Sequence, residues 1–280
     1  MTSGGTSATR VVVEAPARLH FGMLDLRGSL GRRFGGIGAA VQVPSLLLEA
    51  SRADQVEAAG PDAERACEFA HRVIAAHRLT GGVRLRVRRA IPPHAGLGSG
   101  TQLALAVARA VAELYALPTD VVTLAAATQR ARRSAIGTWT FAAGGFILEG
   151  GRHGDTAAPA PILARFPMPS DWRCVIAVPR GEPGMSGAAE AAAFARLPPP
   201  SQAEVERVAH LVLMGILPAV AEGDLAAFGA ALSEVQRVNG GWFAAAQGGV
   251  FAPGPTEMLV RRMGEWGAAG VGQSSWGPTA

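Results

Sequence analysis

Residues 91–106, IPPHAGLGSGTQLALA, constrain the fold more than any other segment, because a glycine-dense turn leads directly into an alanine-rich helix. Gly96, Gly98 and Gly100 let the backbone approach a ligand closely and point amide N–H groups toward it. A helix that begins at Ser99 or Gly100 adds the positive end of its dipole. The segment therefore predicts a site that binds the phosphate groups of a small molecule.

The residues on both sides of this turn support the prediction. A strand-like run at residues 83–90, VRLRVRRA, precedes it, and Pro92 and Pro93 stiffen the approach by fixing φ. Residues 103–117 carry apolar side chains at helical spacing, so we expect the helix to be buried. A tight turn or helix cap without a ligand is the alternative interpretation.

Of two common nucleotide-binding motifs, one is excluded and the other fits poorly. A Walker loop needs a lysine whose ammonium reaches the terminal phosphates, and the chain contains no lysine. A Rossmann motif needs an acidic residue about 20 positions downstream for the ribose hydroxyl, and no acidic residue ends a second strand there.

Composition indicates a soluble globular protein with a modest positive charge. The 280 residues are 49% hydrophobic, enough for one large or two modest domains, and the formal net charge of +4 favours an anionic substrate. The most apolar window, residues 210–221, contains Pro218 and is too short to cross a bilayer, so no membrane association is expected.

Cys67 and Cys174 are expected to be buried, reduced thiols of a cytoplasmic protein. Residues 1–9 read as a disordered tail.

The order of the predicted elements indicates an α+β protein in two packed halves, strand-rich at residues 10–180 and helix-rich at residues 181–280. Strands are expected at residues 11–14, 18–24, 39–50, 83–90, 141–149 and 172–179, with a break at Pro16 and a last short strand ahead of a turn at residues 272–279. Helices are expected at residues 62–77, 101–116, 119–132, 203–222, 225–246 and 256–266, the third of them capped by Thr119.

Several strings resemble one known superfamily. The segment PHAGLGSGTQLALA resembles the phosphate-binding signature of the GHMP superfamily of galactokinase, homoserine kinase and mevalonate kinase, and the terminal GQSSWGPTA is similar to its last glycine-rich motif. Three strings resemble one branch, the β-ribofuranosylaminobenzene 5′-phosphate synthases, which are not kinases: residues 17–38 (ARLHFGMLDLRGSLGRRFGGIG), 132–151 (RRSAIGTWTFAAGGFILEGG) and 272–279 (GQSSWGPT). The resemblance covers nearly the whole chain and implies a GHMP-kinase-like fold.

The resemblance also implies a reaction. Phosphoribosyl pyrophosphate is joined to 4-aminobenzoate, with release of carbon dioxide and pyrophosphate, in the synthesis of a tetrahydromethanopterin-type cofactor. GHMP kinases commonly carry an aspartate in a pattern like S-G-x-D, which serves phosphoryl transfer. Here Gly137 falls where that carboxylate would lie, and residues 132–148 contain no acidic residue. A retained phosphate site without this carboxylate favours the transferase over a kinase.

In such a reaction the leaving diphosphate needs N–H donors and cations. We assign these to a bound Mg²⁺ and to the glycine-rich turn, namely Gly96, Gly98, Ser99 and Gly100. The hydroxyl of Thr101 is a candidate contact for the metal or a phosphate, with a plain helix cap as the alternative. His94 is a candidate phosphate contact on a loop that is otherwise expected to be exposed.

The developing positive charge on the sugar needs a nearby carboxylate. We assign Asp25 to charge stabilisation or proton handling, with capping of the following glycine turn as the alternative. Arg32 is predicted to bind a carboxylate or the 5′-phosphate through its forked guanidinium, and Arg33 is a weaker candidate. Arg18 and His20 share one face of a strand and are expected to project into the same cleft, with a structural role for His20 as the alternative.

The end of the sequence supplies further candidates. Ser274 and Ser275 are expected to close over the pyrophosphate from the second half. Stacking on the aromatic acceptor is assigned to aromatic residues near the glycine motifs, with core packing as the simpler interpretation: Trp139, Phe141 and Trp276.

The sequence ends at Ala280, directly after the last motif, where the superfamily usually continues, so we expect a chain truncated by some tens of residues. An open sheet edge would favour self-association, which makes a homodimer one expected assembly. Two rival functions are a GHMP kinase that phosphorylates a small alcohol with ATP, and an RNA-binding protein that uses the basic strand at residues 83–90. That strand lacks interleaved aromatic residues, so we expect small-molecule substrates and no nucleic acid partner.

Overall fold

The main sheet is organised by two long antiparallel strands, β1 and β3, which pair along most of their length. The other edge of β3 pairs with β5 at one end and with β6 at the other, and β4 and β8 extend the sheet to six described strands. The computed structural model describes residues 8–131, 133–154, 156, 158–180, 184 and 187–280. The strands of this sheet are β1 (Arg10–Gly22), β3 (Gly36–Ala53), β4 (Glu57–Ala59), β5 (Gly82–Arg89), β6 (Phe146–Glu149) and β8 (Ile162–Phe166).

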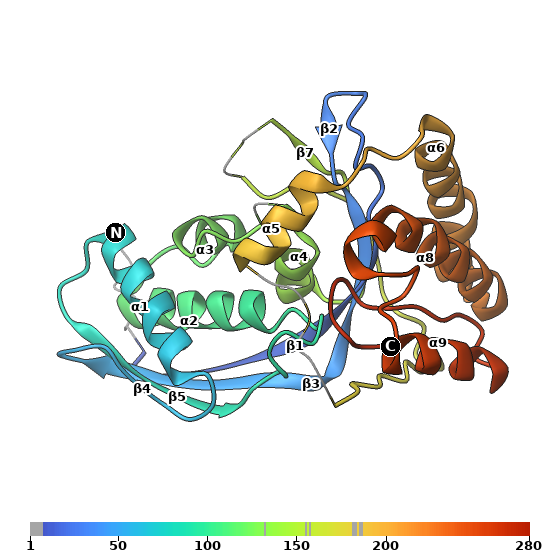
Figure 1. Cartoon of the computed structure of the whole chain (residues 1–280). Coiled ribbons are helices and arrows are strands. Elements are labelled where there is room, and N and C mark those ends of the chain that lie inside the picture. Colours follow the sequence, from blue (N-terminus) through green and yellow to red (C-terminus); the bar gives the residue numbers. More distant parts are fainter. Residues whose placement is uncertain (1–7, 132, 155, 157, 181–183, 185–186) are drawn as a thin grey trace.

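The helices form two groups. Helices α1 and α2 cover one face of the sheet, and α6 to α9 lie together beside its end (Figure 1). A small ribbon of β2 (Arg32–Arg33) and β7 (Arg152–His153) lies apart from the main sheet. The helices are α1 (Ala63–His77), α2 (Ser99–Tyr115), α3 (Val121–Ala127), α4 (Ile136–Ala143), α5 (Gly187–Arg196), α6 (Gln202–His210), the π-helical segment Leu211–Ile216, α7 (Leu217–Glu222), α8 (Leu225–Gln247) and α9 (Pro255–Glu265).

Helix α2 is the central helix of the first half. Its sequence is apolar on nearly all sides, which is typical of a helix that is buried all round. Leu103, Val107 and Leu114 are fully shielded from solvent between the sheet and the neighbouring helices. Because the helix is held on all sides, its first turn is a rigid platform at the end of the sheet.

A second core joins the two halves. Phe146 on β6 lies 6.3 Å from the ring of Phe21 on β1 and 6.0 Å from the ring of Phe228 on α8. The second group of helices therefore packs directly on the strand ends that approach the glycine-rich turn.

The strand-rich first half and the helix-rich second half are confirmed. Helices expected at residues 62–77, 101–116 and 225–246 correspond to α1, α2 and α8 within a few residues. None of the described helices has the length and apolar character that a bilayer span requires. The domain boundary near residue 180 stays a prediction, and residues 1–7 of the predicted tail lie outside the described residues.

Two predictions about strands of the main sheet were wrong. Strand β1 continues through Pro16, because a register shift between Pro16 and Ala17 accommodates a residue that cannot donate to the ladder. Residues 141–149 do not form one strand: α4 ends at Ala143, and β6 begins only at Phe146. The aromatic and β-branched residues of α4 have strand propensity, but its packing against α2 outweighs that preference.

Three further predictions were also wrong. Helix α3 is capped by Asp120, whose Oδ1 accepts from the Thr123 amide at 2.9 Å, and not by Thr119. The described residues at 172–179 and 268–280 form no strand. Cys174 is exposed, and Cys67 is only partly buried.

Candidate functional site

The first turn of α2 presents backbone amides at the end of the sheet. Gly98 is the N-cap residue, with a left-handed φ of 78°, and its carbonyl accepts from the amides of Thr101 and Gln102 at 3.0 Å. The earlier amides of the turn, at Ser99 and Gly100, have no partner within the helix. A Cβ at position 98 would come within 2.8 Å of Arg18 Cγ, so both conformation and space require glycine here. The turn has the geometry of an anion cradle.

Three arginines surround this cradle. Arg18 donates from Nη1 to the Gly96 carbonyl at 2.5 Å. On the other side, a Cβ at Gly100 would lie 2.7 Å from Arg65 Nη2 and 3.5 Å from Arg130 Nη2. Cations from β1, from α1 and from the segment after α3 therefore converge on one helix start.

These guanidinium groups are partly shielded from water. Burial lowers the pKa of Arg18 to about 10, while the Glu190 carboxylate opposes the shift. Burial and the neighbouring charges of Arg65 and Arg72 lower the pKa of Arg130 to about 10. Both stay cationic near neutral pH. The Nε atom of Arg130 is buried without a hydrogen-bond partner among the described residues, so a cation lies beside the cradle with donor capacity left over.

The terminal turn at residues 272–280 contacts the cradle directly. The Ser274 hydroxyl accepts from the His20 amide at 3.0 Å and donates to the Gly96 carbonyl at 2.7 Å. A Cβ at Gly277 would lie only 2.1 Å from the Gly96 nitrogen, so the two backbones are in direct contact. Thr279 Oγ1 donates to the Ala95 carbonyl at 2.5 Å. Segments about 180 residues apart in the sequence thus form one site.

Two titratable side chains are buried behind it. His20 Nε2 lies 3.1 Å from the Ser134 hydroxyl, which also interacts with the Glu149 carboxylate. Burial, with a smaller contribution from the Arg18 charge, lowers the pKa of His20 to about 3, so the imidazole is neutral. Burial raises the pKa of Glu149 to about 7, although the Ala135 amide donates to Oε1 at 3.1 Å. His20, Ser134 and Glu149 connect the site to a carboxyl group that titrates near neutrality.

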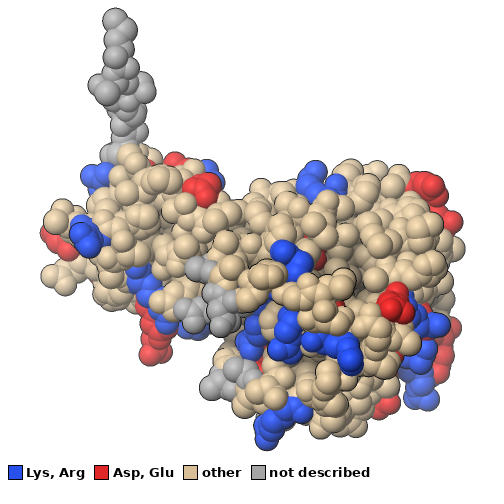
Figure 2. Space-filling view, turned by 90° about the horizontal axis from the view of Figure 1, so that it is seen from above, with Lys and Arg blue, Asp and Glu red and all other residues tan. Residues whose placement is uncertain are grey.

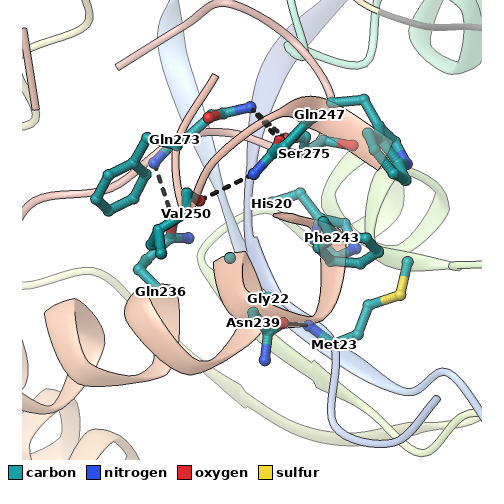
Figure 3. A pocket seen from close by; sticks show the side chains of 13 residues that line it. His20, Gly22, Met23, Gln236, Asn239, Phe243, Gln247, Val250, Gln273 and Ser275 are labelled. Carbon is teal, nitrogen blue, oxygen red and sulfur yellow. Dashed lines mark hydrogen bonds between the residues drawn. The ribbon is translucent and has the colours of Figure 1, made fainter. Parts of the chain in front are cut away.

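A pocket opens next to His20, on the side of the second helix group (Figure 3). Gly22 and Met23 at the end of β1 form one wall, and Asn239 and Phe243 of α8 form another. The terminal turn closes a third side. Its lining residues from that turn are Gln273, Ser275 and Trp276. Ser274, which contacts the cradle at Gly96, therefore lies between two residues of the pocket wall, Gln273 and Ser275.

The structure places the predicted site residues in two groups. It brings most of them together around the cradle and the pocket, and these are Arg18, His20, Gly96, Gly98, Ser99, Gly100, Thr101, Ser274 and Ser275. Thr101 lies in the first turn of α2, and its methyl group is beside Gly137. A Cβ added at Gly137 would be 3.1 Å from Thr101 Cγ2.

Asp25 and Arg32 make local contacts in the β2 region. Asp25 Oδ1 accepts from the amides of Arg27 at 2.6 Å and Gly28 at 2.8 Å, which is the capping arrangement. Arg32 is exposed and donates to the carbonyls of Gly150 at 3.0 Å and Gly151 at 3.2 Å. Their catalytic roles stay predictions.

The remaining candidates lie in different surroundings. His94 is exposed on the loop before the cradle. Trp139 donates from Nε1 to the Ala160 carbonyl at 2.8 Å, and Phe141 packs against the first core. Trp276 lines the pocket, with its ring 4.8 Å from that of Phe243. Of the three aromatic candidates, Trp276 is the one in the pocket.

Sequence reasoning missed four residues of this site: Arg65, Arg130, Glu149 and Asn239. Each belongs to an element that looks ordinary in the sequence, and arginine is the only strongly basic residue type in the chain. Glu149 lies one position beyond residues 132–148, which contain no acidic residue. An acidic residue that directly follows three apolar strand residues, as in FILE, was the available signal.

The face above β2 and α5 carries excess positive charge. Figure 2 looks down on this face and shows basic side chains gathered near its middle. Arg27, Arg32 and Arg33 of the β2 region are all exposed. Such a face favours the approach of an anionic substrate.

Comparisons with known proteins agree with this geometry. Residues 63–144, which contain the cradle, match the model of the GHMP kinases N terminal domain. The chain is 34% identical to a beta-ribofuranosylphenol 5'-phosphate synthase of Methanothermobacter thermautotrophicus, over 96% of this chain and 87% of that protein. A synthase of the same name from Methanocaldococcus jannaschii is 33% identical, over 81% of this chain and 76% of that protein.

Solved structures show the same fold. Mevalonate kinase of L. major in complex with R-mevalonate has a TM-score of 0.67 at 16% identity, over 99% of this chain and 88% of that chain. Homoserine kinase from Cytophaga hutchinsonii has a TM-score of 0.64 at 16% identity, over 100% of this chain and 86% of that chain.

Proposed function

Since this chain belongs to the β-ribofuranosylphenol 5′-phosphate synthase family of the GHMP superfamily, we propose that it transfers a phosphoribosyl group from phosphoribosyl pyrophosphate to a para-substituted benzoate. The products are carbon dioxide, pyrophosphate and a ribosylated arene for a tetrahydromethanopterin-type cofactor. The names of the relatives specify a phenol product, which favours 4-hydroxybenzoate as acceptor over the 4-aminobenzoate expected from the motifs.

The bond changes balance without a net proton transfer. The bond between the anomeric carbon and pyrophosphate breaks, and its electron pair leaves with pyrophosphate. The ring carbon that bears the carboxylate supplies the pair for the new carbon–carbon bond. The bond to the carboxylate then breaks, its pair restores the aromatic ring, and carbon dioxide departs.

The observation that carries this proposal is the convergence of Arg18, Arg65 and Arg130 on the first turn of α2. Preorganised N–H donors and cations that face a developing negative charge lower the barrier to its formation. Pyrophosphate is the group that gains charge in this reaction. We assign the acceptor to the adjoining pocket beside His20, which must widen to admit a ring because its free volume is about 40 Å³.

We propose that a Mg²⁺ ion accompanies the diphosphate and is held mainly by the substrate. No group of three His, Cys, Asp or Glu side chains is arranged as a metal site in the part of the chain that the structure describes. Mg²⁺ often binds phosphate oxygens and water with only one or two protein ligands. We assign the Thr101 hydroxyl to it. The bound ion would neutralise charge on the diphosphate, and chelation should abolish turnover until Mg²⁺ is restored.

The direct test supplies Mg²⁺, phosphoribosyl pyrophosphate and either 4-hydroxybenzoate or 4-aminobenzoate with a labelled carboxyl group. We expect labelled carbon dioxide and pyrophosphate in equal amounts, and only when both substrates are present. ATP-dependent phosphorylation of a small alcohol, without release of carbon dioxide, would instead establish the kinase alternative.

Asp25 and Arg32 remain our proposed catalytic residues. We expect Asp25→Ala and Arg32→Ala each to lower kcat/KM more than tenfold, or by about 1.4 kcal/mol. Asp25→Asn is the matched control, because an amide oxygen still caps the turn and only the charge is lost. If Asp25→Asn keeps the wild-type rate, Asp25 only shapes the loop. For Arg32, a wild-type rate in a folded Arg32→Ala variant would remove it from the site.

A further inference from the structure

The side chain of Asn239 has a defined orientation in the pocket. It is 4% exposed, and its Oδ1 accepts from the Met23 amide at 2.5 Å. Because a backbone N–H needs an acceptor, the oxygen must face Met23, and the NH₂ group must point the other way. Among the described residues this NH₂ group has no hydrogen-bond partner. A buried donor without a partner costs free energy, so it calls for a missing acceptor.

The other amide side chains of the pocket are already engaged with the protein. Gln236 donates to the Phe21 carbonyl and accepts from the Gln273 amide at 2.9 Å. Gln273 Oε1 accepts from the Ala252 amide at 2.8 Å, and Gln247 donates to the Val250 carbonyl at 2.9 Å. These bonds fix the walls, as Figure 3 shows for several of them. Of these amide side chains, Asn239 is the one whose NH₂ group has no hydrogen-bond partner among the described residues.

The walls suit a flat aromatic ring. Phe243 and Trp276 line the pocket with their rings 4.8 Å apart, and Met23 contributes a flexible thioether. Aromatic and methionine side chains make favourable contacts with aromatic rings. Among the residues that the structure describes, no arginine lines this pocket. Its chemistry therefore fits a neutral ring substituent and not an anionic group.

The pocket lies in line with the cradle along β1. Arg18 contacts the cradle, His20 lies between the cradle and the pocket, and Gly22 abuts Asn239 Oδ1. Two residues of a strand span roughly 6.6 Å, so Asn239, beside Gly22, lies beyond His20 by about the length of a substituted benzene ring. An acceptor with its carboxylate end beside His20, on the side of the cradle, would therefore place its para substituent near Asn239.

We propose that this pocket holds the aromatic ring of the acceptor and that the Asn239 NH₂ group donates a hydrogen bond to an oxygen substituent para to the carboxylate. This inference rests on the proposed function and deepens it, since it makes Asn239 the residue that selects a hydroxy acid over an amino acid analogue. A phenolic oxygen accepts a hydrogen bond readily. An aromatic amine is mainly a donor, and it gains positive charge as its electrons move into the ring during attack.

The test exchanges the donor for an acceptor. Asn239→Asp keeps an oxygen for the Met23 amide and replaces NH₂ by a second oxygen, so it should favour the amine. We expect the ratio of kcat/KM for 4-hydroxybenzoate to that for 4-aminobenzoate to fall at least tenfold. Asn239→Leu removes both polar groups and should lower kcat/KM for 4-hydroxybenzoate more than for 4-aminobenzoate. An unchanged ratio in a folded Asn239→Asp variant would overturn the inference.

A binding measurement separates this inference from the proposed function. We expect 4-hydroxybenzoate to quench tryptophan fluorescence through Trp276, and Trp276→Phe should remove most of the signal. If the wild-type protein releases carbon dioxide from neither acid, the proposed function fails. The pocket assignment would still stand if Asn239→Asp weakened binding of 4-hydroxybenzoate at least tenfold, and it would fall if binding were unchanged.

Discussion

His20 and Glu149 make the stability of this protein depend on pH in opposite directions. Burial keeps His20 neutral, so acidification below its ordinary pKa of 6.5 protonates the unfolded chain first and destabilises the fold. Burial of Glu149 favours its protonated form, so a rise in pH from about 4.5 to 7 ionises the unfolded chain first and also destabilises the fold. Between about pH 4.5 and 6.5 the two effects partly cancel.

We expect Glu149→Gln to remove one of these effects. A pKa that is raised from 4.5 to about 7 corresponds to a loss of about 3 kcal/mol in the free energy of unfolding by pH 7.5. The free energy of unfolding of the variant, relative to that of wild type, should therefore increase by about 3 kcal/mol as the pH rises from 4.5 to 7.5. Urea unfolding at a series of pH values measures this difference.

His20→Asn is the matching variant at the other residue. Its free energy of unfolding should no longer fall below pH 6.5 through protonation of residue 20. The decrease between pH 4.5 and 7 that Glu149 causes should remain. A pH-independent difference between Glu149→Gln and wild type would show that Glu149 has an ordinary pKa in the folded protein.

At the scale of an element, α8 contains two adjacent glycines in contrasting surroundings. A Cβ at Gly240 would lie 2.2 Å from the Val250 carbonyl oxygen, whereas a Cβ at Gly241 would meet nothing within 4 Å. We expect Gly240→Ala to destabilise the protein by about 1–3 kcal/mol through overpacking. Gly241→Ala should stabilise it by about 0.5–1 kcal/mol, because alanine favours the helix.

Thermal unfolding of the two variants measures this contrast within one helix. Gly240 also lines the pocket, so a displaced loop in Gly240→Ala should weaken binding of 4-hydroxybenzoate. Equal melting temperatures for both variants would mean that α8 and the loop at Val250 are not in close contact.

At the scale of the whole molecule, the terminal turn holds the cradle. Thr279 is completely buried and donates to the Ala95 carbonyl. Thr279→Val keeps the shape and leaves that carbonyl without its partner, which should cost about 1–3 kcal/mol of stability. It should also weaken binding of pyrophosphate, because Ala95 adjoins Gly96. Calorimetric titration with pyrophosphate and a melting curve measure both effects.

The control is Thr80→Val, at an exposed bend remote in sequence from the turn. It should leave both the stability and pyrophosphate binding close to wild type. Thr279→Val with normal pyrophosphate affinity would show that the cradle keeps its shape without the terminal turn.

Much of the fold was predictable because local signals agreed with the tertiary environment. The glycine-rich turn and the apolar repeat of α2 both follow from short-range sequence, and the structure confirms the helix. Strand propensity misled the prediction at α4, where contact with α2 decides the conformation. The prediction of a strand break at Pro16 was wrong because the bulge at this position depends on pairing with β3. The sequence of β1 alone does not show that pairing.

The candidate site was only partly predictable, for a related reason. Arg18, His20 and Ser274 lie in motifs that the sequence marks, and the structure brings them within hydrogen-bond distance of one another or of the cradle backbone. Arg130 and Asn239 lie in unremarkable stretches. What singles them out is a buried polar atom that has no partner in the described part of the chain, and burial is a property of the packed molecule.

The sequence by itself determined that a phosphate-binding turn opens a buried helix, since glycine conformations and apolar spacing are local properties of the chain. It also determined the family, since long motifs are carried by the order of residues. Only the tertiary structure decided that cations from three elements meet at Gly98 and Gly100, and that Asn239 lines a pocket together with Phe243 and Trp276. These are distances between residues far apart in the chain, and packing of the two halves sets them.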